Sequence, residues 1–332
     1  MSYAFLTLNK KKKILIINNL YTFSNMKRSI IGKIVVIFLA IIVFGGNTLF
    51  AQENRQWWNS LTPAWKKIFR DLELKGKDVE PTDEQLADIV KMQQINCSGN
   101  KEITSLKPLA QLKFLTKINC SGTNITSLDG IEGLTNLVDL NCSNNDNINS
   151  LIPVSNLTNL VSINCGNTMV KSLAPLRGLT NLKKLDVHFC TVNNLIQIKD
   201  LKKLTDLNVS QNQSLYTIEG VDKLLNLINF DCSETNVDDL TPLQSLKYLE
   251  SLHVSDTKVV TLRPLQGVRS LTEVDCSNTG ISAASLDYFY AHFGLTMFRG
   301  RNLSNITQKQ LDDFTASFSK KNPNCTLVLT ID

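Results

Sequence analysis

Residues 115–134 read LTKINCSGTNITSLDGIEGL, and this stretch decides the fold. Its apolar side chains alternate at Ile118 and Cys120 and then recur at every third position as far as Leu134. Alternation predicts a short strand with one buried face. A three-residue period predicts 3₁₀ turns, in which residues i and i+3 eclipse one another. The stretch therefore predicts one short strand followed by a tight return.

The same pattern occurs nine times, at intervals of 22 or 23 residues. A unit of this length cannot bury its own apolar face, so the copies must stack and share one elongated core. Five of the returns carry a proline at one position, where a fixed φ suits the first residue of a helical turn. These prolines are Pro108, Pro153, Pro175, Pro242 and Pro264. The strand segments of the nine copies begin at Ile95, Ile118, Leu140, Ile163, Leu185, Leu207, Phe230, Leu252 and Val274.

Every copy matches L-x-x-L-x-L-x-x-N-x-L, often with Cys or Val in the third apolar position. On this pattern residues 92–281 resemble the leucine-rich repeat proteins, and most of all the 22-residue subclass of the internalins. The resemblance implies an α/β solenoid, a right-handed horseshoe with a parallel β-sheet on its concave face and short 3₁₀ turns on its convex side. It also implies that the side chain in the asparagine position bonds the backbone of the turn. Threonine can do this more weakly, and we expect a weak point at Cys190, which takes that position once.

The N-terminal segment is basic and apolar. Residues 1–51 carry seven positive charges and no acid, so the formal net charge of +5 becomes −2 without them, which leaves no basic patch for nucleic acid. Met26-Lys27-Arg28 precedes an apolar run over residues 34–44, and Ala51 precedes the expected cleavage point. This order predicts a secretory signal that starts at Met26, and hence a secreted or cell-surface protein. The run is short for a membrane span, and an uncleaved membrane anchor is the alternative.

Cysteine also follows the repeat. Cys97, Cys120, Cys142, Cys165, Cys232 and Cys276 share one inward strand position, which Val187, Val209 and Val254 fill in the other copies. Exchange with valine indicates a position for a small apolar side chain, and free cysteine behaves as one. We therefore expect buried free thiols rather than disulfides or a metal site.

Different sequence precedes and follows the repeats. The predicted domains are a leader (1–51), a helical N-terminal cap (52–94), nine repeats (95–281) and a β–α C-terminal cap (282–332). In the N-terminal cap, Thr62-Pro63 and Thr82-x-x-Gln85 predict two helix starts. Trp57, Trp58 and Trp65 are expected to cover the open core there, with a ligand platform as the alternative. In the C-terminal cap we expect a helix over 285–293, a strand over 295–298, a capping box at Thr307-x-x-Gln310 and a last strand over 326–331.

Outward side chains of the expected strands form polar columns of Asn, Asp and Ser. On the last five rungs eight acidic residues face Lys183 and Lys184, a net charge of −6. A wall of one sign can steer an oppositely charged partner, so we expect this part of the concave face to bind a protein with a basic surface. The alternative is a solvated repeat consensus. The candidate residues are Asp186, His188, Phe189, Asp206, Asn208, Asp231, Glu234, Glu250, His253, Asp256, Glu273 and Asp275.

Catalytic and cofactor motifs are absent from the sequence, so no enzyme, metal or cofactor is expected. His253, Asp231 and Ser255 could suggest a triad, but they belong to an open sheet without oxyanion donors. The sequence thus favours protein–protein recognition without catalysis. The alternatives are a carbohydrate-binding protein, for which Phe189 is the one outward aromatic side chain, and a structural module of a larger envelope assembly.

Overall fold

The computed structural model describes residues 46–331, so the basic and apolar parts of the expected leader lie outside the described residues. The expected cleavage point after Ala51 lies within helix α3 (Gly46–Ser60). Within residues 46–331, none of the helices combines the length and the apolar character that a membrane span needs.

The described residues fall into two compact units. One consists of residues 46–60 and 80–87, and the other of residues 61–79 and 88–331. Within the first unit, Trp58 Nε1 donates to Glu80 Oε2 at 2.6 Å, and the Arg55 guanidinium pairs with Asp83 at 2.6 Å. These bonds tie α3 to the segment that carries the start of helix α5 (Asp83–Ile89).

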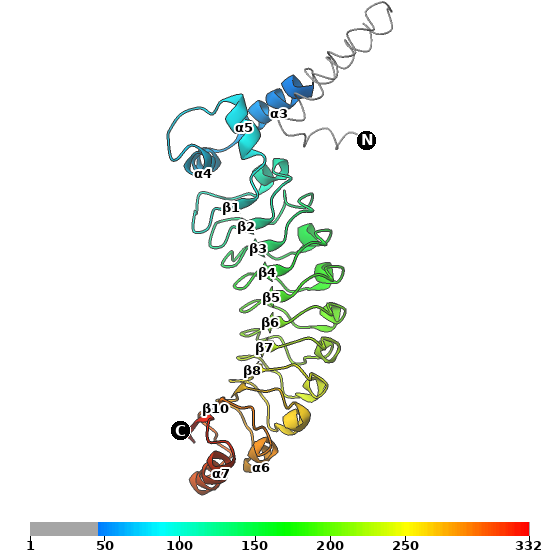
Figure 1. Cartoon of the computed structure of the whole chain (residues 1–332), viewed down its shortest axis with the longest axis vertical. Coiled ribbons are helices and arrows are strands. Elements are labelled where there is room, and N and C mark those ends of the chain that lie inside the picture. Colours follow the sequence, from blue (N-terminus) through cyan, green and yellow to red (C-terminus); the bar gives the residue numbers. More distant parts are fainter. Residues whose placement is uncertain (1–45, 332) are drawn as a thin grey trace, which may run out of the picture. The chain divides into compact units, whose positions relative to one another are not determined.

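The second unit is built on one open sheet of eleven parallel strands, which follow one another in chain order (Figure 1). The nine predicted starting residues are the central, buried residues of β1–β9, and each pairs with its counterpart in the next repeat, as Ile95 does with Ile118. The predicted repeat register is therefore confirmed. The strands are β1 (Gln94–Asn96), β2 (Lys117–Asn119), β3 (Asp139–Asn141), β4 (Ser162–Asn164), β5 (Lys184–Asp186), β6 (Asp206–Asn208), β7 (Asn229–Asp231), β8 (Ser251–His253), β9 (Glu273–Asp275), β10 (Met297–Gly300) and β11 (Thr326–Leu329).

Short 3₁₀ turns follow seven of the first eight strands, all but β2, on the opposite side of the core, as predicted. The five expected prolines each occupy the first or second position of such a turn. The turn that begins at Val221 has no proline and instead follows Gly220, whose φ is +97°. A Cβ atom there would lie 2.9 Å from Ile196 Cα, so only glycine allows this close approach. The turns are η4 (Lys107–Gln111), η5 (Ile152–Val154), η6 (Ala174–Leu176), η7 (Ile196–Ile198), η8 (Val221–Lys223), η9 (Thr241–Leu243) and η10 (Arg263–Gly267).

The cysteines of the repeated inward position are free thiols and are buried, as predicted. Burial raises the pKa of Cys97 and of Cys142 to about 12. A thiol of that pKa is protonated at neutral pH and is a poor nucleophile. These side chains therefore serve as part of the apolar core.

The asparagine position connects consecutive turns. Asn145 Nδ2 donates to the carbonyls of Cys120, Cys142 and Ser143 at 2.9–3.1 Å, whereas the hydroxyl of Thr168 donates to one carbonyl, that of Cys165, at 2.7 Å. Cys190, where we expected a weak point because a thiol replaces the amide, still makes such a bond, since its thiol donates to the carbonyl of Cys165 at 3.3 Å. Sulfur is a weak donor, but here it reaches the carbonyl of the preceding rung.

The predicted starts of the two helices near the N-terminus are confirmed. Helix α4 (Pro63–Glu73) begins after Thr62, whose side chain accepts from Trp65 N. The capping box of α5 is complete, since Thr82 N donates to Gln85 Oε1 at 2.8 Å and Gln85 N donates to Thr82 Oγ1 at 3.3 Å. Trp65 is buried, and its Nε1 donates to Ser105 O in the first repeat at 3.1 Å.

After β9 the chain forms α6 (Ala283–Leu286), η11 (Asp287–Phe289), β10, α7 (Gln308–Lys321) and β11. The helix expected over 285–293 is wrong, because Leu286, Phe289 and His292 are buried at a spacing of three, which suits a 3₁₀ turn, while Phe293 is exposed. The expected strand begins two residues later, at Met297. The capping box at Thr307 and the addition of the last strand to the sheet are confirmed.

Candidate binding face of the sheet

We use the term sheet face for the outward side chains of β1–β10, the residue before each strand, and the turn that follows it. In this turn the repeat makes a local bond that the sequence analysis missed. Asn119 Oδ1, for example, accepts from Ser121 N at 3.2 Å and from Ser121 Oγ at 2.8 Å. Asn and Asp commonly bond the backbone two residues ahead, so the Asn-x-Ser spacing was the signal. The same backbone bond occurs at Asn96, Asn141, Asn164, Asp186, Asn208, Asp231 and Asp275.

Next to these turns lies a column of residues with left-handed backbone, one on each of the nine rungs, which we call the turn-edge column. Several of its side chains bond from rung to rung, as when Asn167 Nδ2 donates to Asn144 Oδ1 at 3.0 Å. Phe189 interrupts this polar column and is 57% exposed. The column consists of Gly99, Gly122, Asn144, Asn167, Phe189, Gln211, Glu234, Asp256 and Asn278.

His188 stands beside Phe189 in a position that most other rungs give to serine. Its Nδ1 lies 2.7 Å from Asp186 Oδ1. Its ring also occupies the space above Gly166 on the preceding rung, because a Cβ atom on Gly166 would lie 2.2 Å from His188 Nδ1. The structure thus brings Asp186 and His188 together, and Gly166 makes room for the imidazole ring.

The acidic residues of the sheet face divide into two groups. Glu273 pairs with Arg299 Nη1 at 3.0 Å, and His253 lies between Asp231 (3.9 Å) and Glu273 (3.7 Å). Together with Asp186 beside His188, these carboxylates have a basic neighbour. Over residues 46–331, no cationic side chain lies within ion-pair distance of Asp206, Glu234, Glu250, Asp256 or Asp275.

Two basic residues of the tenth rung were also missed. The sequence analysis counted nine rungs, but β10 continues the sheet and adds Arg299 and, after it, Arg301. With these two charges the net charge of this part of the face falls from −6 to −4. The net charge of this part of the face is still negative, as predicted. Its negative charge is greatest away from the tenth rung, where Arg299 and Arg301 lie.

The possible triad does not form. His253 Nε2 lies 3.5 Å from Ser251 Oγ, and its Nδ1 lies 3.9 Å from Asp231, so Ser255 is not the hydroxyl that the imidazole approaches. In the part of the chain that the structure describes, no group of three or more His, Cys, Asp or Glu side chains is placed to hold a metal ion. Asn208, the remaining candidate, bonds Ser210 through its Oδ1.

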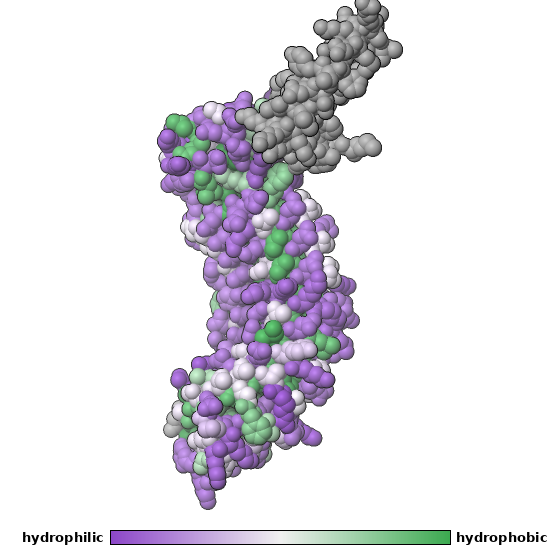
Figure 2. All heavy atoms as spheres, viewed as in Figure 1, coloured by the Kyte–Doolittle hydropathy of each residue, from purple (hydrophilic) through white to green (hydrophobic). Residues whose placement is uncertain are grey.

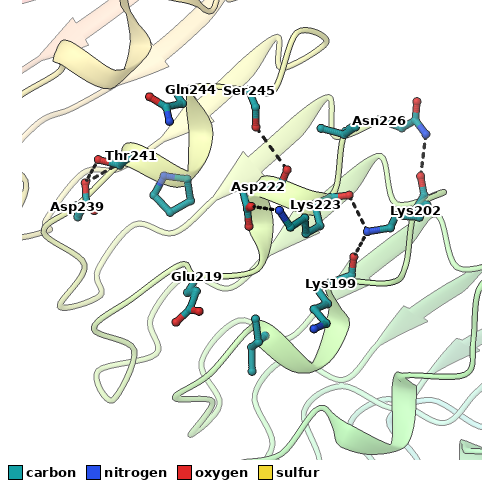
Figure 3. A pocket seen from close by; sticks show the side chains of 13 residues that line it. Lys199, Lys202, Glu219, Asp222, Lys223, Asn226, Asp239, Thr241, Gln244 and Ser245 are labelled. Atoms are coloured by element: carbon teal, nitrogen blue, oxygen red, sulfur yellow. Dashed lines mark hydrogen bonds and ion pairs between the residues drawn. The ribbon is translucent and has the colours of Figure 1, made fainter.

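A groove lies on the other side of the second unit, between the turns η7, η8 and η9 (Figure 3). Its charged side chains are largely occupied. Lys202 Nζ donates to the carbonyls of Lys199 and Lys223, and Lys223 pairs with Asp222 at 2.8 Å. In the view of Figure 2, hydrophobic residues over the repeats form scattered patches among hydrophilic ones. Neither feature provides a group of charged side chains without an oppositely charged neighbour that is comparable to the acidic part of the sheet face.

Comparisons with known proteins bear on the fold. No family model matches the sequence, and no curated protein matches it. Among solved structures, an internalin (inlF) from Listeria monocytogenes is 20% identical with a TM-score of 0.64, over 81% of this chain and 90% of that chain. Internalin C2 from the same organism is 22% identical with a TM-score of 0.56, over 74% and 93%.

A third solved structure is the functional domain of InlJ from Listeria monocytogenes, which is described as including a cysteine ladder. It is 20% identical, with a TM-score of 0.60, over 74% of this chain and 54% of that chain. A plant peptide hormone receptor, RGFR1, solved in complex with RGF2, is 14% identical with a TM-score of 0.55, over 75% of this chain and 46% of that one. With its eleven parallel strands in chain order and its 3₁₀ returns, the chain has the leucine-rich repeat fold seen in the internalins.

Proposed function

We propose that the chain is an exported recognition protein without catalytic activity, and that β6–β9 of its sheet face bind a protein with a basic surface. The observation that carries the proposal is the set of five carboxylates on this face that have no cationic neighbour among residues 46–331. Carboxylates of like sign on one face repel each other, and a cationic partner removes that repulsion and associates faster. The basic leader with its apolar run supports export.

The local bonds of the sheet face favour a protein partner over a sugar. Ser121 and Asn119 bond each other, and the same pair recurs along the column, so fewer of these groups are free for sugar hydroxyls. Among the described residues of the sheet face, Phe189 is the one exposed aromatic side chain. A glycan array with the purified chain tests this alternative directly.

The ends of the repeat region enter the proposal as caps. We propose that residues 52–94 and 282–332 cover the core, because Trp65 is buried against the first repeat and Phe298 stacks on Phe289 at 4.9 Å after the last one. Solenoids need such covering at both ends. If the caps or the 3₁₀ side made the contacts, the chain would instead be a structural envelope module, which the experiment below distinguishes.

Charge neutralisation tests the proposal. The variant Glu234→Gln/Glu250→Gln/Asp256→Asn removes three of the five carboxylates and leaves the backbone bonds of Asp231 and Asp275 intact. We expect it to weaken capture of the partner from an envelope fraction about tenfold or more, and high salt should weaken the wild type similarly. The control Glu102→Gln/Glu219→Gln/Asp238→Asn changes the net charge equally at exposed positions off the sheet face. Unchanged capture by the first variant would place the binding site elsewhere.

A further inference from the structure

Phe189 is an unusual residue for its place in the turn-edge column. Its φ is +48°, a left-handed conformation that glycine, asparagine and aspartate adopt but bulky residues rarely do. All eight other rungs have Gly, Asn or Asp there, or a Gln or Glu that bonds its neighbour. Its phenyl ring is 57% exposed, so the fold gains little from burying it. Strain of this kind is typical of positions kept for binding.

The neighbours of Phe189 are arranged around it. Asn167 bonds Asn144 on one side, and Gln211 bonds Glu234 on the other, so both flanking side chains turn away from the phenyl ring. His188, the residue before Phe189, is held by Asp186 over Gly166. An exposed aromatic side chain on a fixed backbone, beside charged groups, is the usual form of an interface anchor.

The distance from Phe189 to the unpaired carboxylates sets the spacing of the partner. Phe189 lies on the fifth rung, and Glu234, Asp256 and Asp275 lie on the seventh, eighth and ninth. With about 4.8 Å between rungs, these carboxylates are roughly 10 to 19 Å from it along the sheet. An extended peptide covers about 3.3 Å per residue and so spans these distances with about three to six residues.

We infer that Phe189 is the apolar anchor of the sheet face, and that the partner is a polypeptide segment with an apolar side chain about three to six residues from its lysines or arginines. The inference rests on the proposed function, because the carboxylates must bind the cationic part of the same segment. The apolar side chain of the partner packs on the phenyl and imidazole rings, while its cations lie over Glu234, Asp256 and Asp275.

A random peptide library displayed on phage, panned against the purified full chain, tests the spacing. We expect enriched peptides to carry a large apolar residue and two or more Lys or Arg at the stated separation. The enriched peptide is then synthesised and its affinity measured for each variant. Absence of enrichment, or enriched peptides without the apolar residue, would overturn the inference.

Phe189→Asn gives the decisive variant, since asparagine suits the left-handed backbone. We expect it to lower the affinity about tenfold or more and to leave the urea midpoint unchanged or raised. Tyr248→Asn is the matched control, because Tyr248 is also an exposed aromatic that stands where other repeats have asparagine, but off the sheet face. A lowered urea midpoint for Phe189→Asn would show that Phe189 has a structural role, and an unchanged affinity would show that it does not contact the peptide. Either result would overturn the inference.

The neutralised triple variant separates the two proposals. If it loses the peptide while Phe189→Asn keeps it, the anchor is wrong and the acidic site stands. If both variants keep the peptide, the sheet face is not the binding site and both proposals fail. Loss with Phe189→Asn alone would overturn the cationic part of the inference together with the acidic site.

Discussion

The first four rungs of the sheet face and the next five have the same backbone but different surfaces. Asn119 on the second rung and Asp231 on the seventh make the same bond to the backbone two residues ahead, at 3.2 and 2.9 Å. In the first part Lys117 pairs with Asp139 at 2.8 Å, and few charges remain. In the second part five carboxylates have no cationic side chain of residues 46–331 within ion-pair distance. The comparison teaches that the repeat pattern builds the scaffold, whereas residues that depart from the pattern give it a specific surface.

The largest expected effect tests whether the scaffold is truly the same in both parts. Asn145→Ala and Asn212→Ala each remove a side-chain amide that donates to three carbonyls. We expect each to lower the free energy of unfolding by about 3 kcal/mol, measured by urea denaturation. Thr168→Val, which removes a bond to one carbonyl and a weak contact with the Cys190 thiol, should cost about 1 kcal/mol. A clear difference between the two asparagine variants would mean that the parts differ in their framework as well.

A smaller effect is expected where the two parts meet. Gly166→Ser gives the fourth rung the serine of the first three rungs, but its Cβ would lie 2.2 Å from His188 Nδ1. The imidazole must then move away from Asp186, and we expect a loss of about 1 kcal/mol in stability.

The double variant Gly166→Ser/His188→Ser restores the ordinary repeat pattern on both rungs. It should recover most of the stability that Gly166→Ser loses, and the two measurements together give the coupling of the two positions. If Gly166→Ser alone were neutral, the close approach of the His188 ring would not constrain the site.

The smallest effect concerns the segment after the repeats and depends on pH. Burial lowers the pKa of His292, whose Nε2 donates to Leu265 O at 3.0 Å while its Nδ1 is buried without a partner. The unfolded state therefore binds the extra proton first. The neutral imidazole contributes its full stability above the unfolded pKa of about 6.5, and this is lost as the pH falls below that value.

We expect acidification from neutral pH to about pH 5 to lower the urea midpoint slightly through this residue, because the unfolded state binds a proton that the folded state resists. His292→Phe removes the titrating group, so its urea midpoint should fall less than that of the wild type over the same range. The comparison of slopes is needed because the variant also loses the bond to Leu265 O and is less stable at every pH. Equal slopes would show that the imidazole does not contribute.

The features that recur in every repeat could be predicted from the sequence. The register of Ile95 on Ile118, the buried thiols and the turn prolines all follow from period and spacing, because each position has the same neighbours in every copy. Contacts that depend on the particular residues of two neighbouring rungs could not be predicted. The bond from Cys190 to Cys165 O and the pair of Arg299 with Glu273 join residues more than 20 positions apart, in rungs that depart from the pattern.

The segment over 283–293 shows the other limit of the sequence analysis. Leu286, Phe289 and Phe293 fit an α-helical spacing, and Leu286, Phe289 and His292 fit a 3₁₀ spacing equally well. Packing against η10 decides between them, since His292 Nε2 reaches Leu265 O. The charge and the candidate residues of the sheet face were predictable, but which carboxylates lack a cationic neighbour required the structure.

The in-phase register from β1 to β9 has a consequence for the length of the molecule. Deleting or duplicating one whole repeat between Phe189 and Asp275 would change their separation by one strand spacing, about 4.8 Å. No side chain would turn to the opposite face of the sheet. The number of repeats therefore sets the distance between two contact points for a ligand, and that distance can be changed in steps of one repeat by evolution or by protein engineering.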